Sequence, residues 1–288
     1  MADEGGNALA SHAVSMTTDY ANVSTGCPEP YLRRIAGAGF SHVHWCHQWN
    51  TDFVYLGCEV EAIAGWMREL GLALTDLHAS CGPEKNWCSA REHERLAGVE
   101  LVKNRIEMAA RLGSDVIIMH IAAEPAEAEP NQRYWTILRG SLDALEDHAR
   151  SHGVRIAIEN MSQDNFGTLE KLFALYGPHF LGLCYDSGHG NVAGNGLDRL
   201  GRVKDRLISV HLHDNDGTGD QHKLPFEGTV DWPRLARLIA ESAYCKPASL
   251  ESNTRSYPEG VGEREYLGKA LAGAARIAEM VAAHRGGL

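Results

Sequence analysis

The chain has 288 residues, 44% of them hydrophobic, and its 27 basic and 38 acidic residues give a formal net charge of −11. The apolar fraction is large enough for a substantial core, which excludes a disordered or fibrous protein. No apolar run approaches the roughly 18 residues of a membrane helix, and residues 1–10 contain no basic residue, so we expect neither a membrane span nor a signal peptide. Seven cysteines without a CxxC pair indicate reduced thiols and a cytoplasmic protein.

Short apolar or β-branched runs recur along the chain, and each is followed by a longer amphipathic segment. The runs start 26 to 43 residues apart, a spacing typical of strands that are joined by crossover helices. They predict eight strands, at His12–Thr17, Ser41–Trp45, Leu72–His78, Asp115–His120, Val154–Glu159, Phe180–Asp186, Leu207–His211 and Ala248–Glu251.

Helix-start and helix-stop residues lie between these runs. The strongest helical patterns cover Pro28–Ala38, Glu59–Leu70, Arg91–Leu112, Gln132–His152, Asp231–Ala243 and Glu263–His284. Four of them end directly before a glycine, as a loop from a helix to a strand requires. Thr168–Tyr176 and Leu197–Arg206 carry weaker helical patterns.

Eight strands that alternate with eight helical segments, without a linker, predict an α/β protein with one (β/α)8 TIM barrel over residues 12–288. Residues 1–11 are expected to be a disordered lead-in. The competing topology is a doubly wound open sheet, which needs a glycine-rich phosphate turn after the first strand. Thr17-Thr18-Asp19-Tyr20 at that place is not such a turn.

Residues that can bind metal end six consecutive predicted strands, from the third to the eighth. In barrels of this type the chemistry lies at the carboxyl ends of the strands. A single histidine or carboxylate at a strand end is usually structural, but six of them in one apolar mouth would each cost several kcal/mol without compensation. A divalent cation supplies that compensation. The six residues are His78, His120, Glu159, Asp186, His211 and Glu251.

The loop after the seventh strand adds two candidates. Asp220 and His222 are two residues apart, so an extended segment would place both side chains on one side. As a solvated turn the same loop needs no ligand. His189, three residues after Asp186, would either position a substrate hydroxyl or bind a further metal ion.

Taken in order, these motifs resemble the xylose-isomerase-like TIM-barrel superfamily, which contains sugar (phosphate) isomerases and epimerases and the endonucleases that use three zinc ions at abasic sites. The resemblance covers nearly the whole chain from His12 onward. The motifs are Ile158-Glu159-Asn160, Asp186-Ser187-Gly188-His189, His211-Leu212-His213-Asp214, Gly219-Asp220-Gln221-His222 and Leu250-Glu251-Ser252.

The resemblance implies a metal-dependent isomerase or epimerase of a sugar or sugar derivative, which moves a proton beside a carbonyl through a metal-stabilised enediolate. One Mn, Mg, Co or Zn ion would be held by Glu159, Asp186, His211 and Glu251. Glu159 and Glu251 would also be the catalytic pair, since one carboxylate can remove the proton and the other can return it. The sequence does not assign these two roles.

The resemblance also implies an alternative, a multinuclear zinc hydrolase or phosphoesterase similar to the abasic-site endonucleases. Those enzymes hold three zinc ions with nine ligands, and this chain has a matching residue type at every one of the nine positions. A metal-binding barrel without activity is a third reading. The nine residues are His78, His120, Glu159, Asp186, His189, His211, Asp220, His222 and Glu251.

The charge of the loops argues against nucleic acid as the substrate. A duplex-binding rim needs several cations to neutralise phosphates, and the clearest candidates here are Lys85, Lys223 and Arg255, against at least eight acidic residues in the same loops. The stretch from Asn160 to Thr168 also looks more like the sugar isomerases than the endonucleases.

The substrate itself is not defined by the resemblance. The ketose 3-epimerases place an arginine six residues beyond the strand-seven histidine, where this chain has Gly217. Aromatic faces and donors suited to a sugar come from Trp45, His47, Trp49 and Trp87, for which core packing is the alternative, and Lys223 is a further substrate contact. We expect a small carbohydrate substrate, no membrane partner, and a chain that forms homo-oligomers as its relatives often do.

Overall fold

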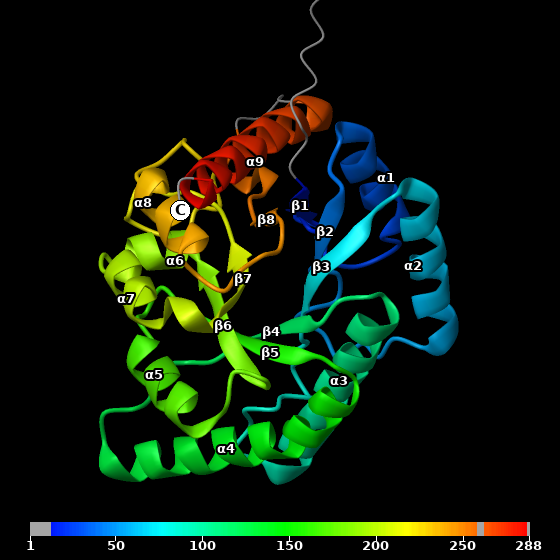
Figure 1. Ribbon diagram of the computed structural model, residues 1–288. Helices are drawn as coiled ribbons and strands as arrows, with labels where there is room; N and C mark the ends of the chain where they lie inside the picture. The colour runs from blue at the N-terminus through cyan, green and yellow to red at the C-terminus, as the bar shows by residue number, and fades with distance from the viewer. Residues whose placement is uncertain (1–12, 258–261, 287–288) are drawn as a thin grey trace, which may run out of the picture.

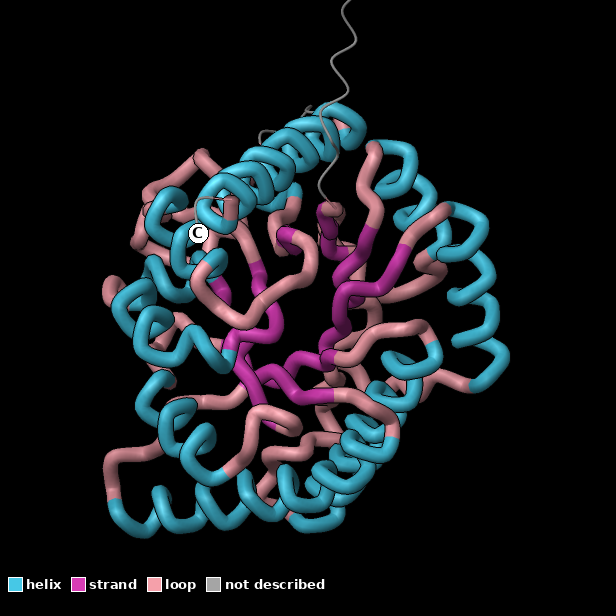
Figure 2. Tube along the Cα trace, in the orientation of Figure 1, coloured by secondary structure: helices cyan, strands magenta, loops and turns pink. Residues whose placement is uncertain are grey.

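Eight parallel strands surround a central axis, and the helices lie outside them (Figures 1 and 2). The computed structural model describes residues 13–257 and 262–286, so the predicted lead-in at residues 1–11 and the strand residue His12 lie outside the described residues. The strands are β1 Val14–Thr17, β2 His42–Trp45, β3 Ala73–His78, β4 Val116–His120, β5 Arg155–Glu159, β6 Leu181–Asp186, β7 Leu207–His211 and β8 Ala248–Leu250.

The strand order is that of a (β/α)8 barrel. Neighbours in the sheet follow one another in the chain from β1 to β7, and β8 pairs with β1. A bridge between Leu212 and Leu250 joins β7 to β8, where the Leu212 N–H donates to the Ser249 carbonyl at 2.9 Å and the Glu251 N–H donates to the Leu212 carbonyl at 3.2 Å. These bonds close the ring, and the predicted single TIM barrel is confirmed.

The helices agree with the predicted pattern, with one addition. They are α1 Glu29–Ala38, α2 Gly57–Leu70, α3 Glu92–Arg111, α4 Ala128–Ser151, α5 Phe166–Leu175, α6 Ser187–Val192, α7 Gly196–Val203, α8 Trp232–Ala240 and α9 Glu263–Arg285, with 3-10 turns η1 Lys204–Arg206 and η2 Thr254–Ser256. The short α6 was not predicted. The predicted helix Leu197–Arg206 is divided between α7 and η1.

The glycines that were predicted to stop helices have left-handed backbones. Gly39 has φ 105° and Gly71 has φ 67°, and in each case the N–H donates to carbonyls of the last helical turn. An L side chain adopts this conformation only at a steric cost. The turn back toward β2 or β3 therefore depends on the missing Cβ.

Alternation along the strands positions the site. Val116 and Ile118 share the side of β4 that carries His120, and Ala157 shares the side of β5 that carries Glu159. Together with Cys184 of β6 they belong to a small buried cluster that is separate from the larger core. Apolar side chains thus fill the interior of the barrel, and the residues at the carboxyl ends of the strands lie at its mouth. No helix within the described residues combines the length and apolarity of a membrane span.

Candidate functional site

His211 lies between the two glutamates that were predicted to be catalytic. Its Nδ1 is 3.0 Å from Glu159 Oε2 and 3.1 Å from Glu251 Oε2. All three side chains are buried or nearly so, Glu251 being the most open at 13% exposure. Neither ring nitrogen of His211 has a well-aligned hydrogen-bond partner among the described residues, which is unusual for a buried imidazole. The ring is therefore placed where a metal ion could replace its proton.

Two further histidines contact the carboxylates of this pair. His120 Nε2 is 3.1 Å from Glu159 Oε2, and His78 Nε2 is 3.3 Å from Glu251 Oε1. The two imidazole rings lie edge to face with centroids 4.7 Å apart. The ends of β3, β4, β5, β7 and β8 thus bring their titratable side chains into one cluster.

The β6 side of the mouth is built around Asp186 and Asp220. Asp186 caps α6 by accepting the His189 N–H at 2.6 Å. His189 Nδ1 is 2.9 Å from the Asn160 carbonyl oxygen and 3.2 Å from Glu159 Oε1, and its Nε2 is 3.4 Å from Asp220 Oδ2. His222 repeats the arrangement, with Nδ1 2.6 Å from the Glu251 carbonyl oxygen and Nε2 3.1 Å from Asp220 Oδ2.

These bonds determine which nitrogen of each ring faces the cavity. A backbone carbonyl can only accept, so Nδ1 of His189 and of His222 carries the proton and donates it. Nε2 then faces Asp220 in both residues. Metal-binding histidines are commonly oriented in this way by a carbonyl or carboxylate behind the ring.

The charges of the cluster are strongly coupled. Burial would raise the pKa of Glu159, but His211, His120 and His189 together hold it well below its ordinary value. Burial likewise opposes ionisation of Glu251, and His211 and His78 hold its pKa well below 4.5. Burial lowers the pKa of His78 to about 4, whereas Asp220, Glu251 and Asp186 outweigh burial at His222 and raise its pKa to about 10.

The donor set fits divalent cations. His78, Glu159 and His211 offer ligand atoms that all lie within 4.8 Å of one another, and so do His213, Asp220 and His222. Imidazole nitrogens and carboxylate oxygens suit Zn²⁺, and carboxylates with few imidazoles suit Mn²⁺. The ring nitrogens of buried His211, which have no well-aligned hydrogen bond among the described residues, also fit a metal ligand.

The predicted four-residue metal set is connected but not equally close. Glu159, His211 and Glu251 meet directly, as given above. Asp186 joins them through His189, whose Nδ1 is 3.6 Å from Asp186 Oδ1. All nine predicted metal-ligand positions belong to this network of contacts.

Sequence reasoning assigned no role to four buried side chains at this mouth. His213 Nε2 is 3.0 Å from Asp186 Oδ2, and its ring stacks on His222 with centroids 4.1 Å apart. His44 and Asp76 lie deeper, joined by a 2.6 Å contact, and Cys46 lies beside them. Asp76 and His213 lie two residues from the strand-end residues His78 and His211, and this spacing is the signal that could have indicated them.

The predicted substrate contacts are mostly occupied within the protein. Trp45 is buried and donates its indole N–H to Tyr55 Oη at 3.1 Å, and Trp87 is buried against the outer core. His47 is held on both sides, by Tyr55 Oη at 2.6 Å and the Gly26 carbonyl oxygen at 2.7 Å. Lys223 lies in the loop after β7, with Nζ 3.6 Å from Asp216 Oδ2.

Trp49 is the aromatic residue that borders the histidine cluster. It is half-buried, and its ring centroid lies 5.3 Å from that of His78 and 5.5 Å from that of His120. A planar wall at this place could pack against the apolar face of a bound sugar.

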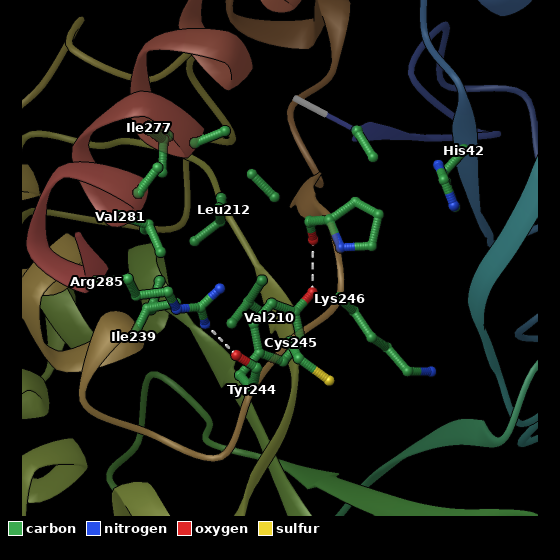
Figure 3. Close-up of a pocket in the computed structure, with 15 residues that line it drawn as sticks. His42, Val210, Leu212, Ile239, Tyr244, Cys245, Lys246, Ile277, Val281 and Arg285 are labelled. Carbon is green, nitrogen blue, oxygen red and sulfur yellow. Dashed lines mark hydrogen bonds between the residues drawn. The ribbon is translucent and has the colours of Figure 1, made fainter. Parts of the chain in front are cut away.

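A separate cavity of about 390 Å³ lies toward the opposite end of the strands (Figure 3). His42, Cys245 and Lys246, which lie at or before the amino ends of β2 and β8, line it together with Ile277 and Arg285 of α9. The Arg285 guanidinium donates to the Tyr244 carbonyl, and Lys246 Nζ is 2.5 Å from Asp115 Oδ1. Its cations are thus already paired, and none of the clustered strand-end residues lines it.

Comparison with known proteins places these features in a family. A family model described as xylose isomerase-like TIM barrel matches residues 32–277. Uncharacterized protein y4fM of Sinorhizobium fredii is 34% identical over 280 residues, which is 88% of this chain and 89% of that protein. Fructoselysine 3-epimerase of Shigella flexneri is 24% identical over 163 residues, 53% of this chain and 58% of the epimerase. Probable endonuclease 4 of Mycobacterium leprae is 26% identical over 170 residues, 54% of this chain and 64% of the endonuclease.

Solved structures share the fold along the whole barrel. A D-tagatose 3-epimerase-like protein has a TM-score of 0.69 at 19% identity and covers 96% of this chain and 99% of its own. L-ribulose 3-epimerase has a TM-score of 0.73 at 15% identity, with 96% of each chain covered. From the closed ring of eight strands and the match over residues 32–277, we conclude that the chain belongs to the xylose isomerase-like TIM-barrel family.

Proposed function

We propose that the protein is a metal-dependent isomerase or epimerase of a small sugar or sugar derivative. The observation that carries the proposal is the approach of Glu159 and Glu251 to the same nitrogen of His211, at 3.0 and 3.1 Å. Epimerases among the sequence relatives and the structural neighbours support the same class.

The two carboxylates reach this point from different sides. Glu159 ends β5 and Glu251 follows β8, three positions apart in the strand order, with β7 and its His211 between them. An epimerisation needs one group to take a proton from carbon and a second group to deliver a proton on the other face. Two carboxylates held on separate strands around one centre can divide that work.

The chain supplies a ligand set for the ion as well. Glu159, Asp186, His211 and Glu251 would hold it, and His189 and His120 would steady Glu159 from behind. A divalent ion bound there would stabilise the negative charge that develops on a substrate oxygen when the neighbouring carbon loses its proton. The protein's own part is to hold the two carboxyl groups on separate strands around that centre, so that one can accept a proton and the other can deliver one.

Exposure indicates the direction from which a substrate would enter. Glu159 and His211 are fully buried, whereas the side chains of His120 and Asp220 are 31% and 38% exposed. Together with Trp49 they border the open side of the cluster. A sugar would therefore place its reactive carbonyl end inward and its remaining hydroxyls toward His120, Asp220 and Trp49.

A zinc hydrolase is the second candidate, and a specific arrangement favours it. His189, Asp220 and His222 form a group of their own, with both Nε2 atoms within 3.4 Å of Asp220 Oδ2. This group could bind an additional zinc ion, which a hydrolase with several zinc ions would need. Three lysines that could neutralise the phosphates of a DNA backbone already have partners within the protein, which argues against DNA as the substrate. Lys223 faces Asp216, Lys171 pairs with Glu124, and Lys85 donates to the Asp52 carbonyl.

Deuterium incorporation tests the proposed class even while the sugar is unidentified. The metal-loaded protein is incubated in D2O with a panel of free and phosphorylated ketoses, and each sugar is analysed by mass spectrometry. Proton transfer predicts deuterium at the carbon beside the carbonyl of a turned-over sugar, and no incorporation with Glu159→Gln or Glu251→Gln. Glu227→Gln, which removes a carboxylate at the exposed loop contact with Tyr257, is the matched control.

The same preparation is assayed for nicking of duplex DNA with an abasic site. Nicking that depends on the bound metal, together with no deuterium in any sugar, would replace the isomerase proposal with the hydrolase. Deuterium incorporation without nicking would exclude the hydrolase.

A further inference from the structure

Beside His211, a second set of side chains comes together, with the ring centroids of His44 and His78 4.4 and 5.2 Å from that of His211. His44 and Cys46 lie two residues apart at the end of β2, so both point to the same side, and His78 comes from β3. With Glu251 they offer four ligand atoms that all lie within 4.8 Å of one another. Neither His44 nor Cys46 belongs to the ligand set of the proposed catalytic ion.

The separations of these atoms are close to those of a tetrahedral zinc site. His78 Nε2 is 3.3 Å from Glu251 Oε1, His44 Nε2 is 3.8 Å from the same oxygen, and Cys46 Sγ is 3.9 Å from it. Zinc bonds of about 2.0 Å to nitrogen or oxygen and 2.3 Å to sulfur give, at tetrahedral angles, separations of roughly 3.3 Å between nitrogen and oxygen ligands and roughly 3.5 Å between either of these and sulfur. The 2.9 Å between His44 Nε2 and Cys46 Sγ has to lengthen, and the distances of these two atoms from Glu251 Oε1 have to shorten by a few tenths of an ångström.

The back of His44 is held as the ring of a metal ligand usually is. Its Nδ1 is 2.6 Å from Asp76 Oδ1, and the Ser209 hydroxyl donates to the other oxygen of Asp76. Ionised Asp76 accepts the proton of Nδ1, which leaves the lone pair of Nε2 facing Cys46 and Glu251. This is the carboxylate–histidine arrangement found behind metal sites.

We propose that His44, Cys46, His78 and Glu251 bind a soft divalent cation such as zinc at a second site. One thiolate and one carboxylate balance its charge, which a buried site requires. The thiol proton leaves to the solvent when the sulfur coordinates. A sulfur ligand favours Zn²⁺ or Co²⁺ over Mg²⁺ or Mn²⁺.

The second site shares one residue with the proposed catalytic ion. Glu251 turns Oε1 toward His78 and Oε2 toward His211, so one carboxylate can bridge the two positions. The inference does not depend on the reaction, because it concerns metal binding alone. An inactive protein with a sulfur-ligated ion would sustain it.

Cobalt binding tests the proposal with a signal specific for sulfur. The full chain is stripped with a chelator and titrated with Co²⁺, and absorbance is followed in the near ultraviolet, where thiolate-to-cobalt charge transfer absorbs. We expect a band that saturates with one class of bound Co²⁺ and is absent in Cys46→Ser. Asp76→Asn should keep the band but weaken binding by about 10- to 100-fold, as removal of an outer hydrogen bond does.

Cys184→Ser is the matched control, because Cys184 is the other fully buried thiol and lies on β6. The thiolate-to-cobalt band should remain in this variant. X-ray absorption of the zinc-loaded wild type gives a test that is independent of any variant, with a sulfur scatterer expected at about 2.3 Å. A band that survives in Cys46→Ser, or zinc that binds without a sulfur neighbour, would overturn the proposal.

Discussion

His222 shows how single residues at this mouth are constrained. Its backbone has φ 47°, a left-handed conformation that costs free energy in a residue with a Cβ. Contacts of its ring with the Glu251 carbonyl, Asp220 and the stacked ring of His213 hold it there. Such strain tends to persist where the orientation of a side chain matters for function.

Glu251→Gln tests the role of a single carboxylate. The amide keeps the size of the side chain but cannot take up a proton, so turnover should fall by at least about 100-fold. The circular dichroism spectrum should match that of the wild type. Steady-state rates on the sugar identified by deuterium incorporation, measured with metal content, check the result, and a variant with undiminished turnover would remove Glu251 from the proposed pair.

Gly188→Ala tests the close packing behind His213. Gly188 lies in the first turn of α6, and a Cβ added to it would lie 1.9 Å from His213 Cε1. The His213 ring or the helix must therefore shift. Overpacking of this kind costs about 1 to 3 kcal/mol, measurable as a lower urea midpoint. Gly167→Ala in α5 is the matched control, because its Cβ meets no described atom within 4 Å, and its midpoint should be equal or higher. Equal midpoints for the two variants would contradict the packing argument.

The helices and strands were predictable wherever residues close in sequence determine where they begin and end. Every predicted strand that falls within the described residues lies within two residues of an observed one, because crossover spacing and helix-stop glycines act over short distances. Helix α6 escaped because its six residues include two glycines and no apolar periodicity, and its start depends on the Asp186 cap. Asp76 and His44 were not predicted as site residues because the prediction considered the last residue of each strand, and both precede it.

Asp115→Asn tests the amino end of the barrel, away from the proposed chemistry. Asp115 precedes β4 and lies 2.5 Å from Lys246 Nζ and 2.8 Å from the Arg155 guanidinium. Burial opposes its ionisation, but the two cations hold its pKa below the ordinary 3.8. The ion pairs therefore stabilise the fold above pH 3.8 and lose this effect as the pH falls through the lower folded pKa.

Because Asp115 is 47% exposed, we expect the loss at pH 7 to be no more than about 1 kcal/mol. Urea unfolding of the variant and the wild type between pH 7 and pH 3 measures it. The difference should shrink toward the acid end while turnover at pH 7 is unchanged. A difference that grows as the pH falls would have the wrong sign for a depressed carboxyl pKa.

At the scale of the whole molecule, the barrel brings residues together that are far apart in the chain. His78 and Glu251 are separated by 173 positions, yet their side chains are 3.3 Å apart. Topology alone predicted that such strand ends converge, and the structure agrees. The pairing of particular atoms, and which aromatic rings face the mouth, depends on side-chain packing, and so Trp49 rather than Trp45 borders the cluster.

Removal of the proposed metal ion should destabilise the entire fold, and more strongly at alkaline pH. In the stripped protein, Asp220, Glu251 and Asp186 outweigh burial and raise the pKa of His222 to about 10. Protonation of His222 therefore stabilises the fold below pH 6.5, and this contribution is lost as the pH rises toward 10.

A bound divalent ion replaces that charge and competes with protons. At 100 times its dissociation constant an ion adds about 2.7 kcal/mol, or roughly 5 °C in a chain of this size. Differential scanning calorimetry with and without zinc should show a larger gain at pH 9 than at pH 6, and equal gains would mean that the ion does not displace protons from this cluster.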